Sequence, residues 1–236
     1  MRTEYKFLLS TSGYERLRER CRFMFNPDPH GQSEGAYPVF SAYYDRADLH
    51  YLYQKINGEF DHIKVRLRVY SPDLERGQKA FLEAKIKENS SQNKIRIPLD
   101  YHPGLLNPGT WYSLQSPEMD KMLRHCHDLY HVCNVYYERQ AWHFRPTAAL
   151  DIRINFDTNL AVLPPTQMRI NPTALEAWRV MPADNIICEI KVPGTSIPRF
   201  LRKELRLVGA DQVRISKYAE GMLTRACRPS SEGVFL

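Results

Sequence analysis

The sequence of 236 residues contains no apolar run that approaches the roughly 20 residues of a membrane-spanning helix. Its first residues show no basic segment followed by an apolar one, so we expect no signal peptide. The five cysteines form no CxxC pair and are odd in number, which favours free thiols in a reducing compartment over a disulfide framework. These absences predict a cytoplasmic protein without a membrane span in this chain.

Several common catalytic motifs are also missing. Gly194-Thr-Ser lacks the glycine-rich lead and the lysine of a P-loop. No Ser/His/Asp or Cys/His arrangement can be argued, and the histidines and cysteines of residues 125–133 match no zinc-binding spacing well. Any chemistry must therefore come from other residues.

Hydrophobic residues make up 43% of the chain, enough for a sizeable core, so we do not expect disorder. The formal net charge of +6 favours anionic partners, namely phosphates, nucleic acid or an anionic surface. The basic residues alternate along expected strands without an aromatic stacking platform, which argues against nucleic acid.

Charged residues, most of them basic, alternate with apolar ones in several segments along the chain. These segments are 2–6, 64–70, 83–87, 94–97, 151–157 and 189–191. Because a strand sends alternate side chains to opposite faces, each segment has one charged and one apolar face. The recurrence on separate strands favours strands gathered around a polyanion, although a solvated outer face is the alternative for any one segment.

The pattern predicts an α+β fold with about eight strands, at 2–8, 39–44, 60–70, 79–87, 94–99, 132–144, 148–157 and 185–192. Helices are expected at 10–22, 48–57, 117–129, 175–178, 198–207 and 216–226. Since strands predominate and hairpins join most of them, a closed antiparallel sheet with flanking helices is the simplest arrangement. We expect a single domain over 1–228 and a loose C-terminal tail at 229–236.

Arginine can hold phosphate oxygens through two hydrogen bonds, and lysine acts as a point charge. The acids within the basic segments could bind Mg²⁺ or Mn²⁺, which prefer oxygen ligands. Each acid could instead pair with the lysine two residues away, and this is the favoured interpretation for every acid except Glu189.

The ordered set of short motifs resembles the VTC domain, the catalytic domain of polyphosphate polymerases, in the superfamily of triphosphate tunnel metalloenzymes and CYTH phosphatases. The motifs are Arg2-x-Glu4-x-Lys6, Tyr43-Tyr44-Asp45, Lys64-x-Arg66-x-Arg68-x-Tyr70, Glu83-x-Lys85, Tyr137-x-Arg139, Arg153-x-Asn155-x-Asp157, Glu189-x-Lys191 and Ser216-Lys217-Tyr218. The resemblance implies a closed eight-stranded antiparallel tunnel. It also implies transfer of the γ-phosphate of ATP onto inorganic polyphosphate, with release of ADP.

The resemblance also implies roles for individual residues. The catalytic positions are Lys64, Arg66, Arg68 and Lys217. The remaining phosphate-binding positions are Arg2, Lys6, Lys85, Lys87, Lys94, Arg139, Arg153 and Lys191. Mn²⁺ or Mg²⁺ would be held by Glu189, with Glu4, Glu83 and Asp157 as further candidate ligands.

Two residues depart from the pattern of the tunnel enzymes. Arg2 stands where the triphosphatases begin with Glu, which removes one metal carboxylate, and Asn155 stands where Thr is expected. The first change disfavours the alternative of a metal-dependent triphosphatase acting on nucleoside or inorganic triphosphate. A non-catalytic polyphosphate-binding domain is a further alternative. A membrane partner and the oligomeric state stay open.

Overall fold

The computed structural model describes residues 2–29, 31, 35–88, 91–144 and 151–227. The chain divides into two compact units. Unit 1 comprises Met1–Pro38, Tyr137–Leu160 and Met181–Ile215, and unit 2 comprises Val39–Tyr136, Ala161–Val180 and Ser216–Leu236. The expected tail at 229–236 and the expected turn at 145–147 lie outside the described residues.

The strands form an antiparallel sheet. Their bounds are β1 Arg2–Ser10, β2 Phe25–Pro27, β3 Ala36–Asp45, β4 His62–Val69, β5 Lys79–Glu88, β6 Ser91–Asp100, β7 Tyr130–Phe144, β8 Arg153–Leu163, β9 Asn185–Pro193 and β10 Asp211–Gln212. The strand order is β10-β1-β9-β8-β7-β3-β4-β5-β6, and β2 pairs with β7. The described residues thus contain ten strands rather than eight, and no pairing among them joins β10 to β6.

Six α-helices and two 3₁₀-helices are present in the described residues. They are α1 Thr11–Met24, α2 His50–Ile56, η2 Pro103–Leu106, η3 Pro108–Ser113, α3 Pro117–His125, α4 Pro172–Trp178, α5 Arg199–Leu207 and α6 Lys217–Ala226. The side chains of Ser10 and Ser216 cap α1 and α6 as N-caps do, which explains where these helices start. Within this part of the chain, no helix is long and apolar enough to cross a membrane.

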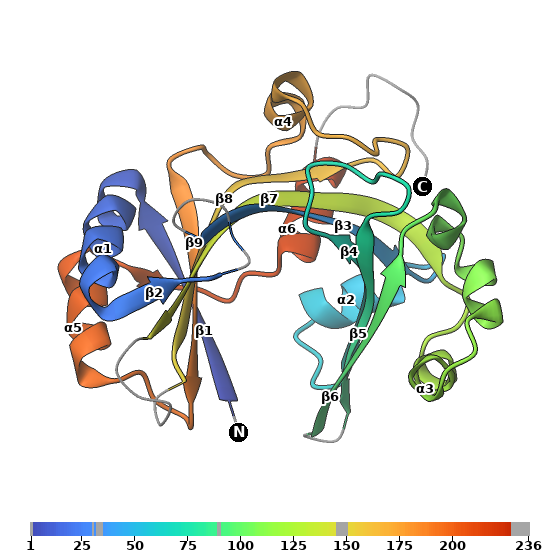
Figure 1. The fold of residues 1–236 in the computed structure, drawn as a ribbon, viewed down its shortest axis with the longest axis horizontal. Coiled ribbons are helices and arrows are strands. Elements are labelled where there is room, and N and C mark those ends of the chain that lie inside the picture. The colour runs from blue at the N-terminus through green and yellow to red at the C-terminus, as the bar shows by residue number, and fades with distance from the viewer. Residues whose placement is uncertain (1, 30, 32–34, 89–90, 145–150, 228–236) are drawn as a thin grey trace. The chain divides into compact units, whose positions relative to one another are not determined.

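The core of unit 1 lies on one face of β1, β8 and β9. In Figure 1, α1 and α5 lie together on this face. Leu17 of α1 and Leu201 of α5 pack there with Phe7 and Ile190 of the strands. Because side chains alternate along β1, Glu4 and Lys6 are left on the opposite face.

Unit 2 has its core on one face of β4, β5 and β6. Val65, Leu67 and Leu82 belong to this core, which Trp111 of η3 and Met122 of α3 cover. The helix α3 lies beside β6 (Figure 1). It ends at His125, short of the expected 129, because Cys126 already has an extended backbone. The opposite face of these strands carries the alternating cations.

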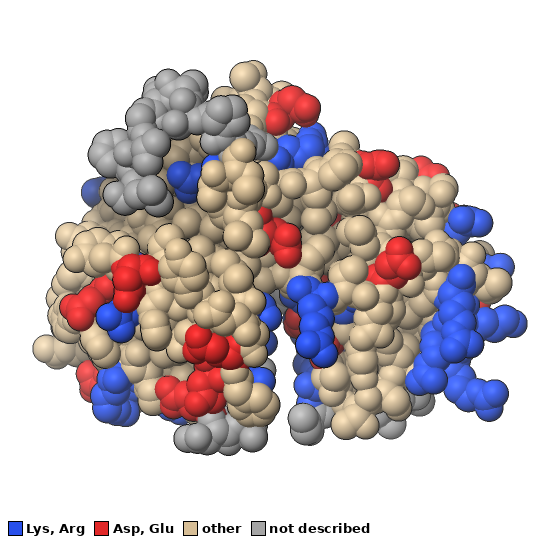
Figure 2. Space-filling model, turned by 180° about the vertical axis from the view of Figure 1, so that it is seen from behind, with Lys and Arg blue, Asp and Glu red and all other residues tan. Residues whose placement is uncertain are grey.

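Basic side chains also gather on helix α5, outside the strands. Figure 2 shows this cluster of Lys and Arg over α5. Its exposed members are Arg199, Arg202, Lys203 and Arg206. Their spacing of three and four residues places them on one side of the helix, as on a solvated helical face.

Candidate functional site

Strands β3 to β6 bring most of the predicted catalytic cations of unit 2 onto one face. In the antiparallel register, Arg66 lies between Tyr43 of β3 and Glu83 of β5, and Glu83 lies opposite Arg96 of β6. Lys64, Lys85 and Lys94 form a second row across the same strands. We call this set the basic face of unit 2: Tyr43, Lys64, Arg66, Arg68, Glu83, Lys85, Lys94 and Arg96.

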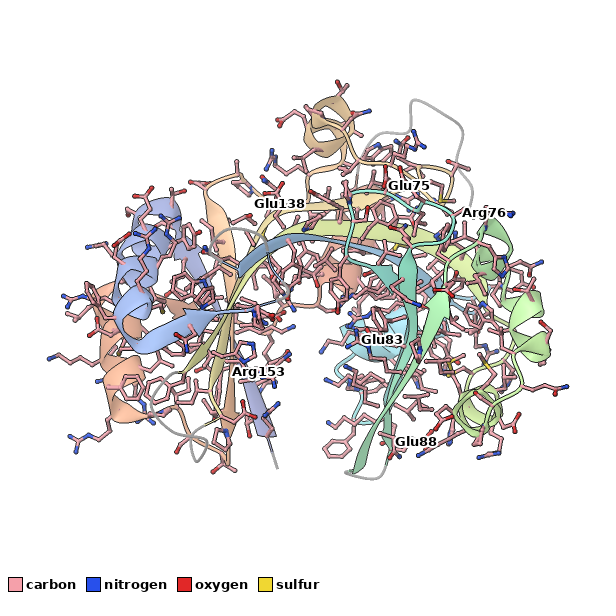
Figure 3. The ribbon with its side chains drawn as sticks, viewed as in Figure 1. Glu75, Arg76, Glu83, Glu88, Glu138 and Arg153 are labelled. Atoms are coloured by element: carbon pink, nitrogen blue, oxygen red, sulfur yellow. The ribbon has the colours of Figure 1, made fainter. Side chains whose placement is uncertain are left out.

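Glu83 is a buried carboxylate within this basic face (Figure 3). Arg66 approaches one of its oxygens with Nη2 at 2.7 Å and Nε at 2.8 Å, and Nη1 of Arg68 is 4.0 Å from the same oxygen. The second oxygen lies 3.4 Å from Nζ of Lys94 and 3.6 Å from Nε of Arg96.

The charges around Glu83 determine its protonation. Burial would raise the pKa of this carboxyl, but the cations of Arg66, Arg68 and Lys94 more than offset burial and lower its pKa to about 2. Glu83 thus stays ionised and holds four cations near one another. Since one carboxylate neutralises only one of them, the face keeps an excess of positive charge.

The lowered pKa of Glu83 predicts a pH-dependent contribution to stability. A folded-state pKa of about 2, below the ordinary value of 4.5, stabilises the fold above about pH 5, and this contribution is lost as the pH falls towards 2. We expect Glu83→Gln to lower the free energy of unfolding by on the order of 2–3 kcal/mol at pH 7, and by clearly less at pH 3. Urea unfolding at both pH values measures this difference.

The exposed Glu75 of the same unit, labelled in Figure 3, is the control for that experiment. Glu75→Gln should change the free energy of unfolding by no more than about 0.5 kcal/mol at either pH. A loss for Glu83→Gln that is equal at pH 7 and pH 3 would contradict the electrostatic explanation.

Tyr43 joins the basic face to helix α6. Its hydroxyl accepts a hydrogen bond from Nη1 of Arg66 at 3.1 Å, and its ring stacks in parallel on Tyr218, with 5.2 Å between the centroids. Burial would raise the pKa of the Tyr43 phenol, but Arg66 and Lys64, with a smaller effect of Arg68, lower its pKa to about 8. The lowered pKa of the phenol therefore reflects the excess of positive charge around it.

Asp45 anchors two helices at the end of β3. Its buried carboxylate accepts hydrogen bonds from the backbone N–H groups of Tyr51 and Leu52 in α2, both at 2.9 Å. It also accepts one from the Tyr218 hydroxyl of α6 at 2.7 Å. This anchor fixes the start of α6, where Lys217 is almost fully buried next to Ser216. The Ser216 hydroxyl in turn lies 3.5 Å from Nζ of Lys64.

In unit 1, Arg139 of β7 holds two buried carboxylates. Its Nε and Nη2 donate to the two oxygens of Asp157, both at 2.7 Å, and Nη2 also donates to Glu189 at 2.8 Å. Burial would lower the pKa of Arg139, but Asp157, Tyr137 and Glu189 raise it well above its ordinary value. The guanidinium of Arg139 therefore stays charged although it is largely buried.

A ladder of alternating charges continues across β1 and β9. Lys6 lies 3.6 Å from Glu4 and 3.7 Å from Glu189, and Lys191 lies 3.5 Å from Glu4. Lys6 also donates to the carbonyl of Ile215 at 2.8 Å. Glu4 and Glu189 are thus brought together around one ammonium group.

The edge of unit 1 carries two more of the predicted phosphate-binding residues. Arg2 pairs with Asp151, and Arg153, exposed on β8 (Figure 3), lies 3.5 Å from the same acid. In unit 2, Lys87 lies over the ring of Phe60 near the end of β5, 4.0 Å from its centroid.

The four predicted metal ligands belong to different clusters of charged side chains. Glu4 and Glu189 adjoin each other in unit 1, whereas Asp157 has both oxygens bound by Arg139, and Glu83 belongs to the basic face of unit 2. Among the described residues, no group of three or more His, Cys, Asp or Glu side chains could hold a metal ion. Of the four, Glu4 and Glu189 lie near the same ammonium group, that of Lys6. A Mg²⁺ or Mn²⁺ ion needs only one or two carboxylates besides water and phosphate oxygens.

Sequence reasoning assigned no role to three residues that contribute to these clusters. Arg96 shares the alternation of Lys94, which was the signal for its place on the basic face. Tyr43 and Asp45 occur in one of the motifs, but their roles depend on contacts with Arg66 and with Tyr218, distant in sequence, and alternation along a strand does not reveal such contacts.

Comparison with solved structures finds proteins that are similar to this chain in fold. A Hippeastrum protein, described as a candidate adenylyl cyclase with a dominant triphosphatase activity, is 15% identical, with a TM-score of 0.52 and 98% of each chain covered. A candidate adenylate cyclase from Bacillus halodurans is 14% identical, with a TM-score of 0.49 over 90% of this chain and 92% of that one. The Hippeastrum structure supports the fold and, at this identity, nothing finer.

The sequence comparisons agree with the fold. No curated protein matches the chain in sequence. The family model for the VTC domain matches residues 1–225, nearly the whole chain and all the clusters described above. The chain therefore belongs to the VTC domain family.

Proposed function

We propose that this protein is a polyphosphate polymerase-like phosphotransferase, which moves the γ-phosphate of ATP onto a polyphosphate chain. The observation that carries this proposal is the basic face of unit 2, where Glu83 holds four cations in place and leaves their charge in excess. A binding site for several linked phosphates needs such an excess. A closed antiparallel tunnel and the cytoplasmic location expected from the sequence are part of the same proposal.

Phosphoryl transfer depends mainly on positioning and on neutralising charge, and needs little covalent chemistry from the protein. Lys64, Arg66 and Arg68 would hold the phosphates of the donor. Lys217, fixed at the start of α6 by the anchor at Asp45, would stabilise the charge on the transferred phosphate. The polyphosphate acceptor would contact Lys85, Lys87 and Lys94, the remaining predicted phosphate-binding cations of the same unit.

A divalent cation fits this proposal at Glu189 and Glu4. Lys6 now lies between these two carboxylates, so the pair already accommodates a positive charge. When bound, Mn²⁺ or Mg²⁺ would neutralise phosphate oxygens. The hydrogen bond from Arg139 at 2.8 Å would orient Glu189, as partners of a metal ligand do.

Two other activities are alternatives to the polymerase, and each would give a different result in the experiment described below. The Hippeastrum protein of similar fold is described as a triphosphatase, so hydrolysis of a triphosphate is the second candidate. The presence of Arg2 favours the polymerase over the triphosphatase, because Arg2 stands where a further metal carboxylate would be needed. Binding of polyphosphate without turnover is the third candidate.

Incubation of the purified protein with ATP and Mn²⁺, with ADP, free phosphate and polyphosphate measured together, separates these activities. We expect ADP and polyphosphate with little free phosphate. Free phosphate without polyphosphate would establish the triphosphatase, and ATP binding without turnover would leave a binding domain.

Glu189→Gln tests, in the same assay, whether turnover needs a metal ion held by Glu189. We expect turnover to fall at least about tenfold while polyphosphate binding persists, because phosphate is held mainly by cations. Glu138→Gln, at an exposed position of β7 labelled in Figure 3, is the matched control and should retain full turnover. Equal turnover of both variants would exclude a role of Glu189 in metal binding.

A further inference from the structure

The basic face of unit 2 ends in a cluster of aromatic rings and one guanidinium group. Tyr70, directly after β4, and Phe81 of β5 make an edge-to-face contact with 5.8 Å between their ring centroids. The guanidinium of Arg96 lies over the Phe81 ring, 3.8 Å from its centroid, and donates to the Tyr70 hydroxyl at 3.3 Å. We call Tyr70, Phe81 and Arg96 the aromatic end of the basic face.

This aromatic end is continuous with the residues proposed to hold the donor phosphates. Phe81 lies directly opposite Arg68 in the register of β4 and β5. Arg96 is shared, since its Nε also lies 3.6 Å from Glu83. Along β4, cations at alternate positions are therefore followed on the same face by an aromatic ring, at Tyr70, so the expectation from the sequence that the strands carry no aromatic stacking platform was wrong here.

Packing of the core does not account for these rings. Tyr70 and Phe81 lie on the polar side of the strands and belong neither to the buried core of unit 2 nor to the side chains packed against it. Tyr70 is 41% exposed, and the side chain of Arg96 is 38% exposed. An accessible aromatic and guanidinium surface beside a cluster of phosphate-binding cations has the chemistry of a base-stacking site.

We propose that the aromatic end is a nucleobase subsite, so that the preferred donor is a nucleoside triphosphate rather than inorganic triphosphate. The inference rests on the proposed function in one respect, because it requires the triphosphate group to bind at Lys64, Arg66 and Arg68. The base stacks on Tyr70 and Arg96 while its phosphates extend along β4. Stacking tolerates any base, so purine triphosphates bind somewhat better than pyrimidine ones without a strict choice of base.

Calorimetric titration of the full chain with ATP and, separately, with inorganic tripolyphosphate tests the subsite. EDTA is present, so that no metal contributes. Tyr70→Ala should weaken ATP binding about tenfold and tripolyphosphate binding less than twofold. Arg96→Lys keeps the charge but removes the planar guanidinium. It should likewise weaken ATP binding more than tripolyphosphate binding. Tyr70→Phe keeps the ring and should retain ATP affinity within about twofold.

Tyr112→Ala is the matched control, since Tyr112 is an exposed tyrosine on η3, which covers the other side of the strands. It should leave both affinities unchanged. Equal weakening of ATP and tripolyphosphate by Tyr70→Ala, or no weakening of either, overturns the subsite. So does a wild-type protein that binds the two ligands equally well.

The polymerase and the nucleobase subsite would be rejected by different experimental results. A selective loss of ATP affinity in a protein that makes neither ADP nor polyphosphate would support the subsite and reject the polymerase. Turnover that is equally fast with ATP and tripolyphosphate, in both wild type and Tyr70→Ala, would support phosphotransfer and reject the subsite.

Discussion

Arg66→Met is expected to lower ATP turnover by about 10²- to 10³-fold, the usual effect of removing one fixed donor to charge that develops in the transition state. Arg66 lies at the centre of the basic face, between Tyr43 and Glu83, and both neighbours hold its guanidinium in position. The fold should survive, because Glu83 keeps three other cations within 4.0 Å. Initial rates of ADP formation measure the loss, and circular dichroism checks that the variant is folded.

Two further variants sharpen this experiment. Arg66→Lys keeps the charge but not the paired donors, so it should recover only part of the turnover. Arg76→Met removes an exposed arginine of the same unit, labelled in Figure 3, and should turn over ATP like the wild type. If Arg66→Met keeps more than a third of wild-type turnover and of ATP affinity, the donor phosphates bind elsewhere.

Arg139→Met is expected to cause the largest loss of stability, with the free energy of unfolding falling by about 3–5 kcal/mol. The exposed fractions of Asp157 and Glu189 are only 1% and 6%, so both carboxylates would lose their shared guanidinium while remaining out of water. Glu189 would keep Lys6 at 3.7 Å, whereas Asp157 would lose its bidentate partner. Urea unfolding at neutral pH measures the change.

A double variant separates the charge from the packing at this site. Arg139→Met combined with Asp157→Leu removes the charges of both residues and should be more stable than Arg139→Met alone, since the Asp157 carboxylate is no longer left buried without its partner and Glu189 keeps Lys6 at 3.7 Å. Arg153→Met, at an exposed position of β8, should cost less than about 0.5 kcal/mol. A double variant that is less stable than Arg139→Met would show that the site depends on shape rather than charge.

The two-residue period of the strands made much of the fold predictable. It placed Lys64, Arg66 and Arg68 on one face and Val65 and Leu67 on the other, as the structure confirms. The expected start of the first helix at residue 10 agrees with α1, which begins at Thr11 after its N-cap Ser10, because an N-cap depends on residues only three apart. The short strands β2 and β10 were missed, since two or three residues carry no periodic signal and pair only because a distant strand is present.

The partners of the charged residues were harder to predict. Glu83 and Glu189 have the same spacing to a following lysine, yet Glu83 contacts cations of β4 and β6, and Glu189 contacts Arg139 of β7. Alternation specifies the face of a side chain, whereas its ion-pair partner depends on the order and register of neighbouring strands. A metal ligand and an ion-pair partner are therefore indistinguishable in the sequence.

The carboxylate of Asp45 also has a consequence for motion. Because it bonds to the first turn of α2 and to Tyr218 of α6 at once, neither helix can open locally without breaking contacts of the other. The two helices therefore fluctuate as one cooperative segment, and their slowest amide protons should exchange together. The backbone of the buried Lys217, at the start of α6, should therefore move only together with that segment.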